Sequence, residues 1–272
     1  MPSCLSRTRT VLASPAPAIL RQCLVLGLVF VVVLAVTGCS REDLVFPDQA
    51  PTPLDLSRAG KLTGTVFFAG EPPERIELSL SGAPGCAAGH GEATLSETVL
   101  VNDGKLENVF VYIQSGLEDR VFAVPREAVV VDQKGCVFLP HVVGAQAHQP
   151  VRFLNSDNLL HNVRAAAIKN KGFNFGLDVA GSARVKQFPV PEVPIPLKCD
   201  VHGWMTSYVC VVPHPYFAVT GAEGAYVIDK LPPGTYVLEA WHEALGTKRQ
   251  EVAVAEDGTA TVDFTFSAAA ND

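Results

Sequence analysis

The chain has 272 residues, with 28 Asp and Glu residues against 21 Lys and Arg residues. Residues 1–38 contain three arginines and no acidic residue, so their removal would leave 18 basic and 28 acidic residues, a net charge of −10. Binding of nucleic acid requires clustered basic residues, and this acidic balance argues against a nucleic-acid partner.

The first forty residues have the layout of an export signal. Arg7, Arg9 and Arg21 form a basic start, residues 22–37 are an uncharged apolar run, and small residues then lead to Cys39. This order is typical of a signal peptide, with a transmembrane anchor as the alternative.

The sequence VTGC, which ends at Cys39, resembles the lipobox of bacterial lipoproteins. The resemblance implies that residues 1–38 are removed and that Cys39 carries a lipid anchor in the membrane of the bacterial cell envelope, facing the periplasm. Ser40 at the next position, by the same resemblance, favours the outer membrane over the inner membrane. Residues 39–59 are polar and rich in proline, and we expect them to form a tether.

Short segments rich in β-branched and aromatic residues follow the tether, separated by turn residues. We expect a first set of strands at 61–70, 75–82, 97–103, 107–114, 127–133, 136–143, 150–156, 161–167, 184–190 and 206–212. A second set is expected at 216–220, 224–229, 234–242, 248–256 and 259–266. This pattern predicts an all-β chain built from antiparallel sandwiches or barrels. We place one domain at 60–213, a second at 214–267 and a tail at 268–272.

Four residues with soft or borderline ligand atoms stand out from the strands. Residues 198–205 read KCDVHGWM, which places Cys199, His202 and Met205 at intervals of three. His161 lies earlier in the chain, in the segment LNSDNLLHNV. Two imidazoles, one thiolate and one weak thioether define a type-1 copper site, because this set suits both Cu(I) and Cu(II). Structural zinc sites rarely use methionine. The sequence therefore predicts one type-1 copper ion.

The segments FLNSDNLLHNVRA and KCDVHGWMTSYVCVV resemble the two copper-ligand segments of the cupredoxins, and the short ligand loop is most similar to the amicyanin type. The resemblance, clearest over residues 130–213, implies a Greek-key β-sandwich in which Asn162 joins the two ligand segments by hydrogen bonds. The segment from His214 onward is similar to the transthyretin-like, carboxypeptidase-regulatory-type domain, which implies a second, smaller β-sandwich.

The expected function is electron transfer between other redox proteins, such as a cytochrome, a dehydrogenase or an oxidase. One alternative is a lipoprotein that carries or buffers Cu(I), and another is an envelope scaffold in which the metal is incidental. An enzyme is not expected, because a type-1 site has no open position for a substrate, and we assign no catalytic residues.

The remaining cysteines divide into a pair and a single residue. Cys86 and Cys136 lie beside glycines in turn-like segments, and an oxidising compartment favours their pairing, so we predict a Cys86–Cys136 disulfide. Cys210, in the strand after the ligand loop, is expected to be a buried core residue.

We expect His202 to lie partly exposed at the tip of the ligand loop, with Trp204 beside it as a docking surface for the redox partner. The alternative is that Trp204 packs inward over Met205. The other histidines of interest, His141, His214 and His242, are expected to be structural and not to form a second metal site.

Overall fold

The structure is a computed structural model that describes residues 44–80, 83–87 and 94–268. The predicted signal peptide, the lipidation at Cys39 and the start of the tether lie outside the described residues. In the part of the chain that is described, none of the helices combines the length and the apolar character that crossing a membrane requires.

The regular secondary structure of the described chain is almost entirely β-strand, as predicted, with a single four-residue helix, α1 (Pro84–Ala87). Its strands form four sheets, two in each of two sandwiches. The predicted strand at 75–82 is wrong: within its described part the structure has one isolated bridge, between Glu77 and Leu95.

The first sandwich contains the first and the last strands of the described chain. One of its sheets comprises β1 (Gly60–Ala69), β2 (Val101–Asn102), β3 (Lys105–Leu106), β15 (Ala225–Leu231), β18 (Thr259–Thr261) and β19 (Phe264–Ser267). The other comprises β4 (Phe110–Ser115), β14 (Phe217–Val219), β16 (Gly234–His242) and β17 (Gly246–Val254).

The second sandwich lies between β4 and β14 in the sequence. One sheet comprises β7 (Val142–Gln146), β9 (His161–Ala165), β10 (Phe173–Leu177), β12 (Glu192–Lys198) and β13 (Thr206–Val212). The other comprises β5 (Val129–Lys134), β6 (Val137–Leu139), β8 (Pro150–Asn155) and β11 (Ala183–Gln187). Two pairs, β5–β8 and β7–β13, are parallel, so the expectation of purely antiparallel sheets is wrong here.

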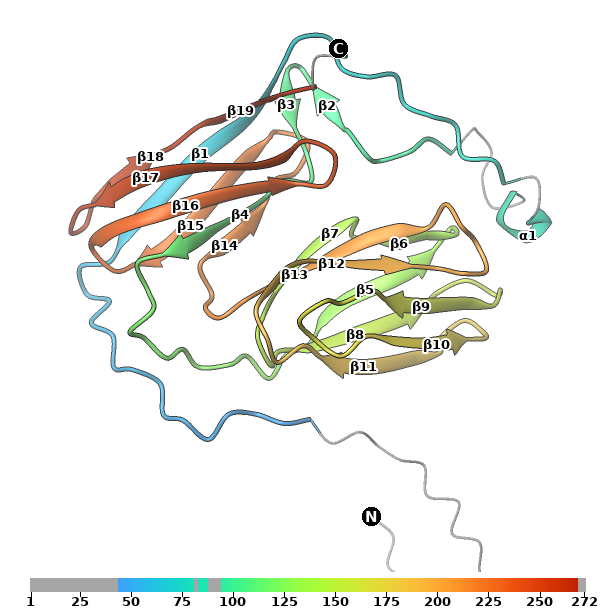
Figure 1. Ribbon diagram of the computed structural model, residues 1–272, viewed down its shortest axis with the longest axis horizontal. Coiled ribbons are helices and arrows are strands. Elements are labelled where there is room, and N and C mark those ends of the chain that lie inside the picture. Colours follow the sequence, from blue (N-terminus) through green and yellow to red (C-terminus); the bar gives the residue numbers. More distant parts are fainter. Residues whose placement is uncertain (1–43, 81–82, 88–93, 269–272) are drawn as a thin grey trace, which may run out of the picture. The chain divides into compact units, whose positions relative to one another are not determined.

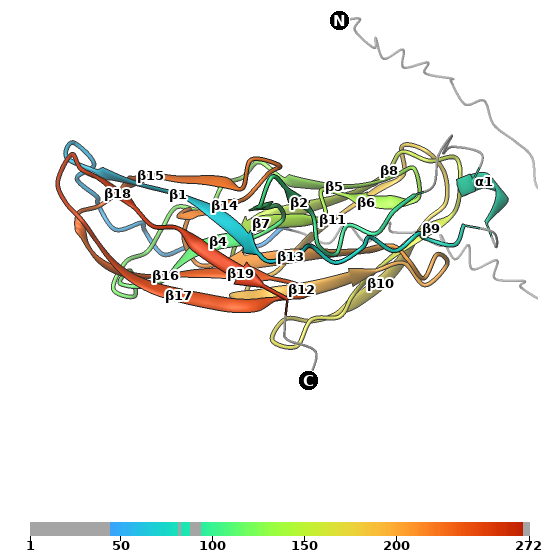
Figure 2. The ribbon, with the colours of Figure 1, turned by 90° about the horizontal axis from the view of Figure 1, so that it is seen from above.

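The predicted domain boundaries are therefore wrong for residues 60–115. β1 pairs with β15, β18 and β19, and Figures 1 and 2 show it beside these late strands. β4 pairs with both β14 and β16. The sandwich that holds the ligand segments is thus an insertion in the other sandwich and does not precede it.

The physical reason is the core of the first sandwich. β1 and the β3–β4 segment contribute buried side chains that pack in one apolar cluster with those of the late strands; they include Leu62, Val66, Phe68, Leu106, Val111, Ile113, Tyr226, Ile228, Leu238 and Phe264. Without the early strands, the late strands would leave this apolar surface exposed to water, at a free-energy cost of about 25 cal/mol per Å² of apolar surface. The second sandwich has its own cluster, which includes Val131, Phe138, Phe153, Val163, Ile195 and Val209.

A third apolar cluster combines residues of both sandwiches: Phe110, Val142, Cys210, Val212 and Trp241. Cys210 is buried and carries a free thiol, as predicted, and burial raises its pKa.

His141 contacts the carboxylate of Glu243, and His214 donates to the carbonyl oxygen of Ile113 at 2.8 Å.

Candidate metal centre

The ligand loop is the connection between β12 and β13. Lys198 pairs with Thr206, and the N–H of Cys199 donates to the carbonyl oxygen of Met205 at 3.2 Å. The N–H of Met205 in turn donates to the carbonyl oxygen of His202 at 3.0 Å. This tight turn places Cys199 and Met205 at its base and His202 between them, and all three side chains are buried.

His161 reaches the same point from β9, the neighbour of β12 in the sheet. Its Nδ1 atom lies 2.9 Å from Nδ1 of His202, and Sγ of Cys199 lies 3.9 Å from that same atom of His202. The ligand atoms of the three residues all lie within 4.8 Å of one another. Two ring nitrogens this close must share a proton or face a common cation, so the arrangement suits a metal ion.

The charges within this group favour the ligand forms of Cys199 and His202. At His161, burial lowers the pKa, but hydrogen bonding to Cys199 and Asp157 outweighs it, and the net pKa is raised. Burial raises the pKa of Cys199, but hydrogen bonding to His161 and to backbone amides outweighs it, and the net pKa is lowered. The pKa of His202 is lowered by burial and by the nearby His161. A thiol that ionises readily and an imidazole that stays neutral are the states that bind a metal.

Asn162 joins the two ligand segments by the hydrogen bonds that the sequence predicted for it. Its Oδ1 atom accepts the N–H groups of Asp200 at 2.6 Å and Val201 at 3.2 Å, and it also receives the Cys199 thiol at 3.3 Å. Its Nδ2 atom donates to Asn174 at 2.8 Å. The start of the ligand loop is therefore fixed to β9.

Asp157 is a member of the candidate centre that the sequence did not identify. One of its oxygens lies 2.9 Å from Nε2 of His161, and the carboxylate also accepts the N–H groups of Gly135 and Cys136 at 2.8 and 2.9 Å. An acceptor at Nε2 places the ring proton there and leaves the Nδ1 lone pair directed at the centre. An acid four residues before the ligand, in SDNLLH, was the available signal.

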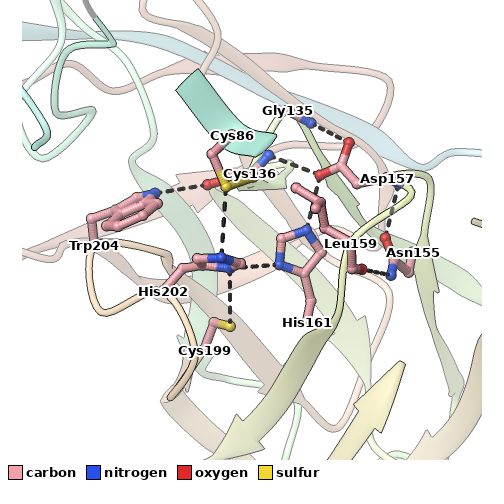
Figure 3. The surroundings of a disulfide bond; sticks show 10 residues. All are labelled: Cys86, Gly135, Cys136, Asn155, Asp157, Leu159, His161, Cys199, His202 and Trp204. Atoms are coloured by element: carbon pink, nitrogen blue, oxygen red, sulfur yellow. Dashed lines mark hydrogen bonds and ion pairs between the residues drawn. A yellow bond between two sulfur atoms is a disulfide. The ribbon is translucent and has the colours of Figure 1, made fainter. Parts of the chain in front are cut away.

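The predicted exposure of His202 and Trp204 is wrong. His202 is only 7% exposed, and Trp204 is half-buried with its indole N–H donated to the carbonyl oxygen of Cys136 at 3.0 Å. The two rings pack at 5.2 Å between centroids. Both side chains are held inward because the turn that carries Cys136 lies over the ligand loop (Figure 3).

The predicted disulfide between Cys86 and Cys136 is present. It brings α1 to the β5–β6 turn, and Sγ of Cys86 lies 3.6 Å from Nε2 of His202. Figure 3 shows His202 between this disulfide and Cys199. The structure thus has a cystine directly beside the imidazole ring of His202, which we had expected to be partly exposed to solvent.

Residues 209–267 match the family described as Carboxypeptidase regulatory-like domain, which agrees with the resemblance found in the sequence. The match does not include the early strands β1 to β4, which complete that sandwich. Among curated proteins, none matches this chain.

Several solved structures are similar to part of the chain. A Cu-containing nitrite reductase from Thermus scotoductus SA-01 is 19% identical with a TM-score of 0.30, over 36% of this chain and 24% of that one. A purple cupredoxin from Nitrosopumilus maritimus is 18% identical with a TM-score of 0.27, over 30% of this chain and 98% of that one. An oxidized amicyanin variant is 21% identical with a TM-score of 0.29, over 37% and 97%.

Proposed function

We propose that this chain binds one copper ion at His161, Cys199, His202 and Met205, and that it serves as a type-1 electron carrier. The convergence of the ligand atoms of His161, Cys199 and His202 within 4.8 Å, in a buried setting, is the observation that carries the proposal. Met205 supports the proposal, because its backbone is hydrogen-bonded to those of Cys199 and His202 at the base of the same loop.

The donor set fits copper better than zinc. A buried thiolate and two neutral imidazoles accommodate both Cu(I) and Cu(II), and a thioether adds a weak contact that tunes the potential. Bound copper would supply a one-electron couple. The chain's part is to hold the donors in place: Asn162 fixes the ligand loop, Asp157 orients His161, and burial excludes water. Donors that do not move between oxidation states favour rapid electron exchange.

The test is visible absorption after loading with Cu(II). The protein is expected to show an intense thiolate-to-copper band, and Cys199→Ser is expected to lose it while keeping its far-UV circular dichroism. Cys210→Ser is the matched control, because it removes the other buried free thiol of the described chain without touching the centre. A colourless, copper-loaded wild-type protein would contradict the type-1 assignment.

One observation favours a second function, the holding of Cu(I). His202 is covered by the disulfide, and this limits the exposed ligand edge through which an outer-sphere carrier exchanges electrons. Electron self-exchange measured by NMR separates the two functions. Rapid exchange supports the carrier, whereas slow exchange with tight retention of Cu(I) against a chelator supports copper handling.

The proposed location is the bacterial envelope, with a lipid on Cys39 and a redox protein as partner. Mass spectrometry of the N-terminal peptide from membranes tests the anchor. An unmodified peptide that begins elsewhere than at Cys39 would contradict it.

A further inference from the structure

We propose that Cys86, Cys136 and His202 form a second site for a soft metal ion, Cu(I), which becomes available when the Cys86–Cys136 disulfide is reduced. The ligand atoms of these three residues lie within 4.8 Å of one another, and all three side chains are buried. This goes beyond the proposed function, since neither cysteine belongs to the type-1 donor set.

His202 presents a different ring nitrogen to each group of donors. Its Nδ1 atom faces His161 and Cys199, whereas its Nε2 atom lies 3.6 Å from Sγ of Cys86 (Figure 3). The two groups are therefore on opposite edges of one imidazole. A disulfide that only reinforced the fold would not need a ligand histidine beside its sulfur.

The position of Cys136 does not depend on the disulfide alone. Asp157 accepts the backbone N–H groups of Gly135 and Cys136, and Trp204 donates to the carbonyl oxygen of Cys136. Cys136 has a φ of 55°, the left-handed conformation that a tight two-residue hairpin turn requires. These contacts hold the backbone of Cys136 beside the ligand loop whether or not its sulfur is bonded.

Cys86 is also held by contacts other than the disulfide. Its N–H donates to the carbonyl oxygen of Ala83 at 2.9 Å, and its side chain belongs to the core cluster of the second sandwich. At Gly85 a β-carbon would come within 2.6 Å of the side chain of Leu159, so α1 sits directly against the loop that leads to His161. Reduction would thus leave two thiols close to His202.

The chemistry requires a two-electron reductant, such as a dithiol. Exchange breaks the S–S bond and forms two S–H groups on Cys86 and Cys136, while two electrons and two protons leave the dithiol, which becomes a disulfide. Binding of Cu(I) then releases the two thiol protons to water and, when copper already occupies Nδ1 of His202, also the proton on Nε2 of that ring. Two thiolates and one imidazole are soft and borderline donors of the kind that select Cu(I).

The experiment counts bound Cu(I) by competition with a chromophoric chelator, on the full chain before and after anaerobic reduction with a phosphine that is then removed. Reduction of the disulfide is checked by mass spectrometry of alkylated peptides. The proposal expects one additional equivalent of Cu(I) after reduction, in wild type and in the Cys210→Ser control. The Cys86→Ser/Cys136→Ser variant is expected to bind the same amount with and without phosphine.

Two further measurements separate this site from the type-1 centre. Cys199→Ser is expected to keep the additional equivalent, and Cys86→Ser/Cys136→Ser to keep the visible Cu(II) band. If the double variant does not fold, the alternative is alkylation of the reduced wild type, in which Cu(I) is expected to protect Cys86 and Cys136. An unchanged Cu(I) count after verified reduction, or failure of Cu(I) to protect these thiols, would show that the cystine is only structural.

Discussion

The indole N–H of Trp204 donates to the carbonyl oxygen of Cys136 at 3.0 Å, across 68 positions of the sequence. This hydrogen bond connects the ligand loop to the β5–β6 turn. The same turn carries Cys136, whose disulfide with Cys86 covers His202. The side chain that the sequence assigned to partner docking therefore helps to hold the ligand loop in place.

The first prediction concerns this bond. Trp204→Phe keeps an aromatic ring against His202 but leaves the Cys136 carbonyl without its donor, so the free energy of unfolding is expected to fall by about 1 kcal/mol. Copper binding and the visible band are expected to persist. Chemical denaturation and absorption measure the two effects. If stability and partner exchange are unchanged by Trp204→Phe but exchange falls in Trp204→Glu, the docking role would be restored.

A second prediction concerns Asp157. Asp157→Asn turns one carboxylate oxygen into an amide nitrogen, so the side chain can no longer accept all three N–H groups, those of Gly135, Cys136 and His161. Loss of such an acceptor is expected to weaken copper affinity by about 10- to 100-fold. The matched control is Asp178→Asn, which changes an exposed acid whose carboxylate accepts a hydrogen bond from the hydroxyl of Ser182. Equal affinities of both variants, measured by competition, would remove Asp157 from the centre.

The third prediction is a dependence of stability on pH that arises from a histidine outside the proposed ligand set. Burial lowers the pKa of His242 to about 4, with a smaller raising effect of Glu243 and a lowering effect of His141. Because the unfolded value is about 6.5, the unfolded chain binds the proton first as the pH falls. Stability is thus expected to be complete above pH ~6.5 and to fall by about 3 kcal/mol as the pH approaches 4.

The His242→Asn variant isolates this contribution, since an Asn oxygen can still accept the N–H of Ala244 as Nδ1 does at 3.2 Å. Its free energy of unfolding, measured by denaturant titration at several pH values, is expected to decline less steeply than that of the wild type. Burial also lowers the pKa of His214, so a residual slope in the same direction remains. If the free energy of unfolding changes with pH equally in the two proteins, His242 has the same pKa in the folded and the unfolded chain.

The fourth prediction follows from the insertion of one sandwich into the other. Residues 214–267 alone are expected not to fold, because β16 lacks β4 and β15 lacks β1. Residues 60–115 joined to 214–267 by a short linker are expected to fold, since Phe217 pairs with Tyr112 and the two ends of the excised segment therefore lie close together. Far-UV circular dichroism and thermal melting compare the two. Cooperative melting of residues 214–267 alone would show that these strands fold without pairing to β1 and β4.

The sequence by itself determined the features that depend on local spacing. Cys199, His202 and Met205 lie within one short segment, and their side-chain chemistry predicts copper before any fold is known. The alternation of apolar residues identified most strands, since side chains on a strand point alternately to its two faces. The pairing of Cys86 with Cys136 followed from composition and compartment.

Only the tertiary structure decided which strands are partners and what covers the ligands. A period of two residues marks a strand but does not say which edge it joins, and β1 pairs with β15 across more than half the chain, from Gly60 to Leu231. In the same way, the contact between Cys86 and His202 spans 116 positions, and the bond from Asp157 to His161 depends on the path of the intervening loop. Contacts of this kind form because sandwich cores must be closed and buried polar groups must find partners, and both conditions are met only in the folded chain.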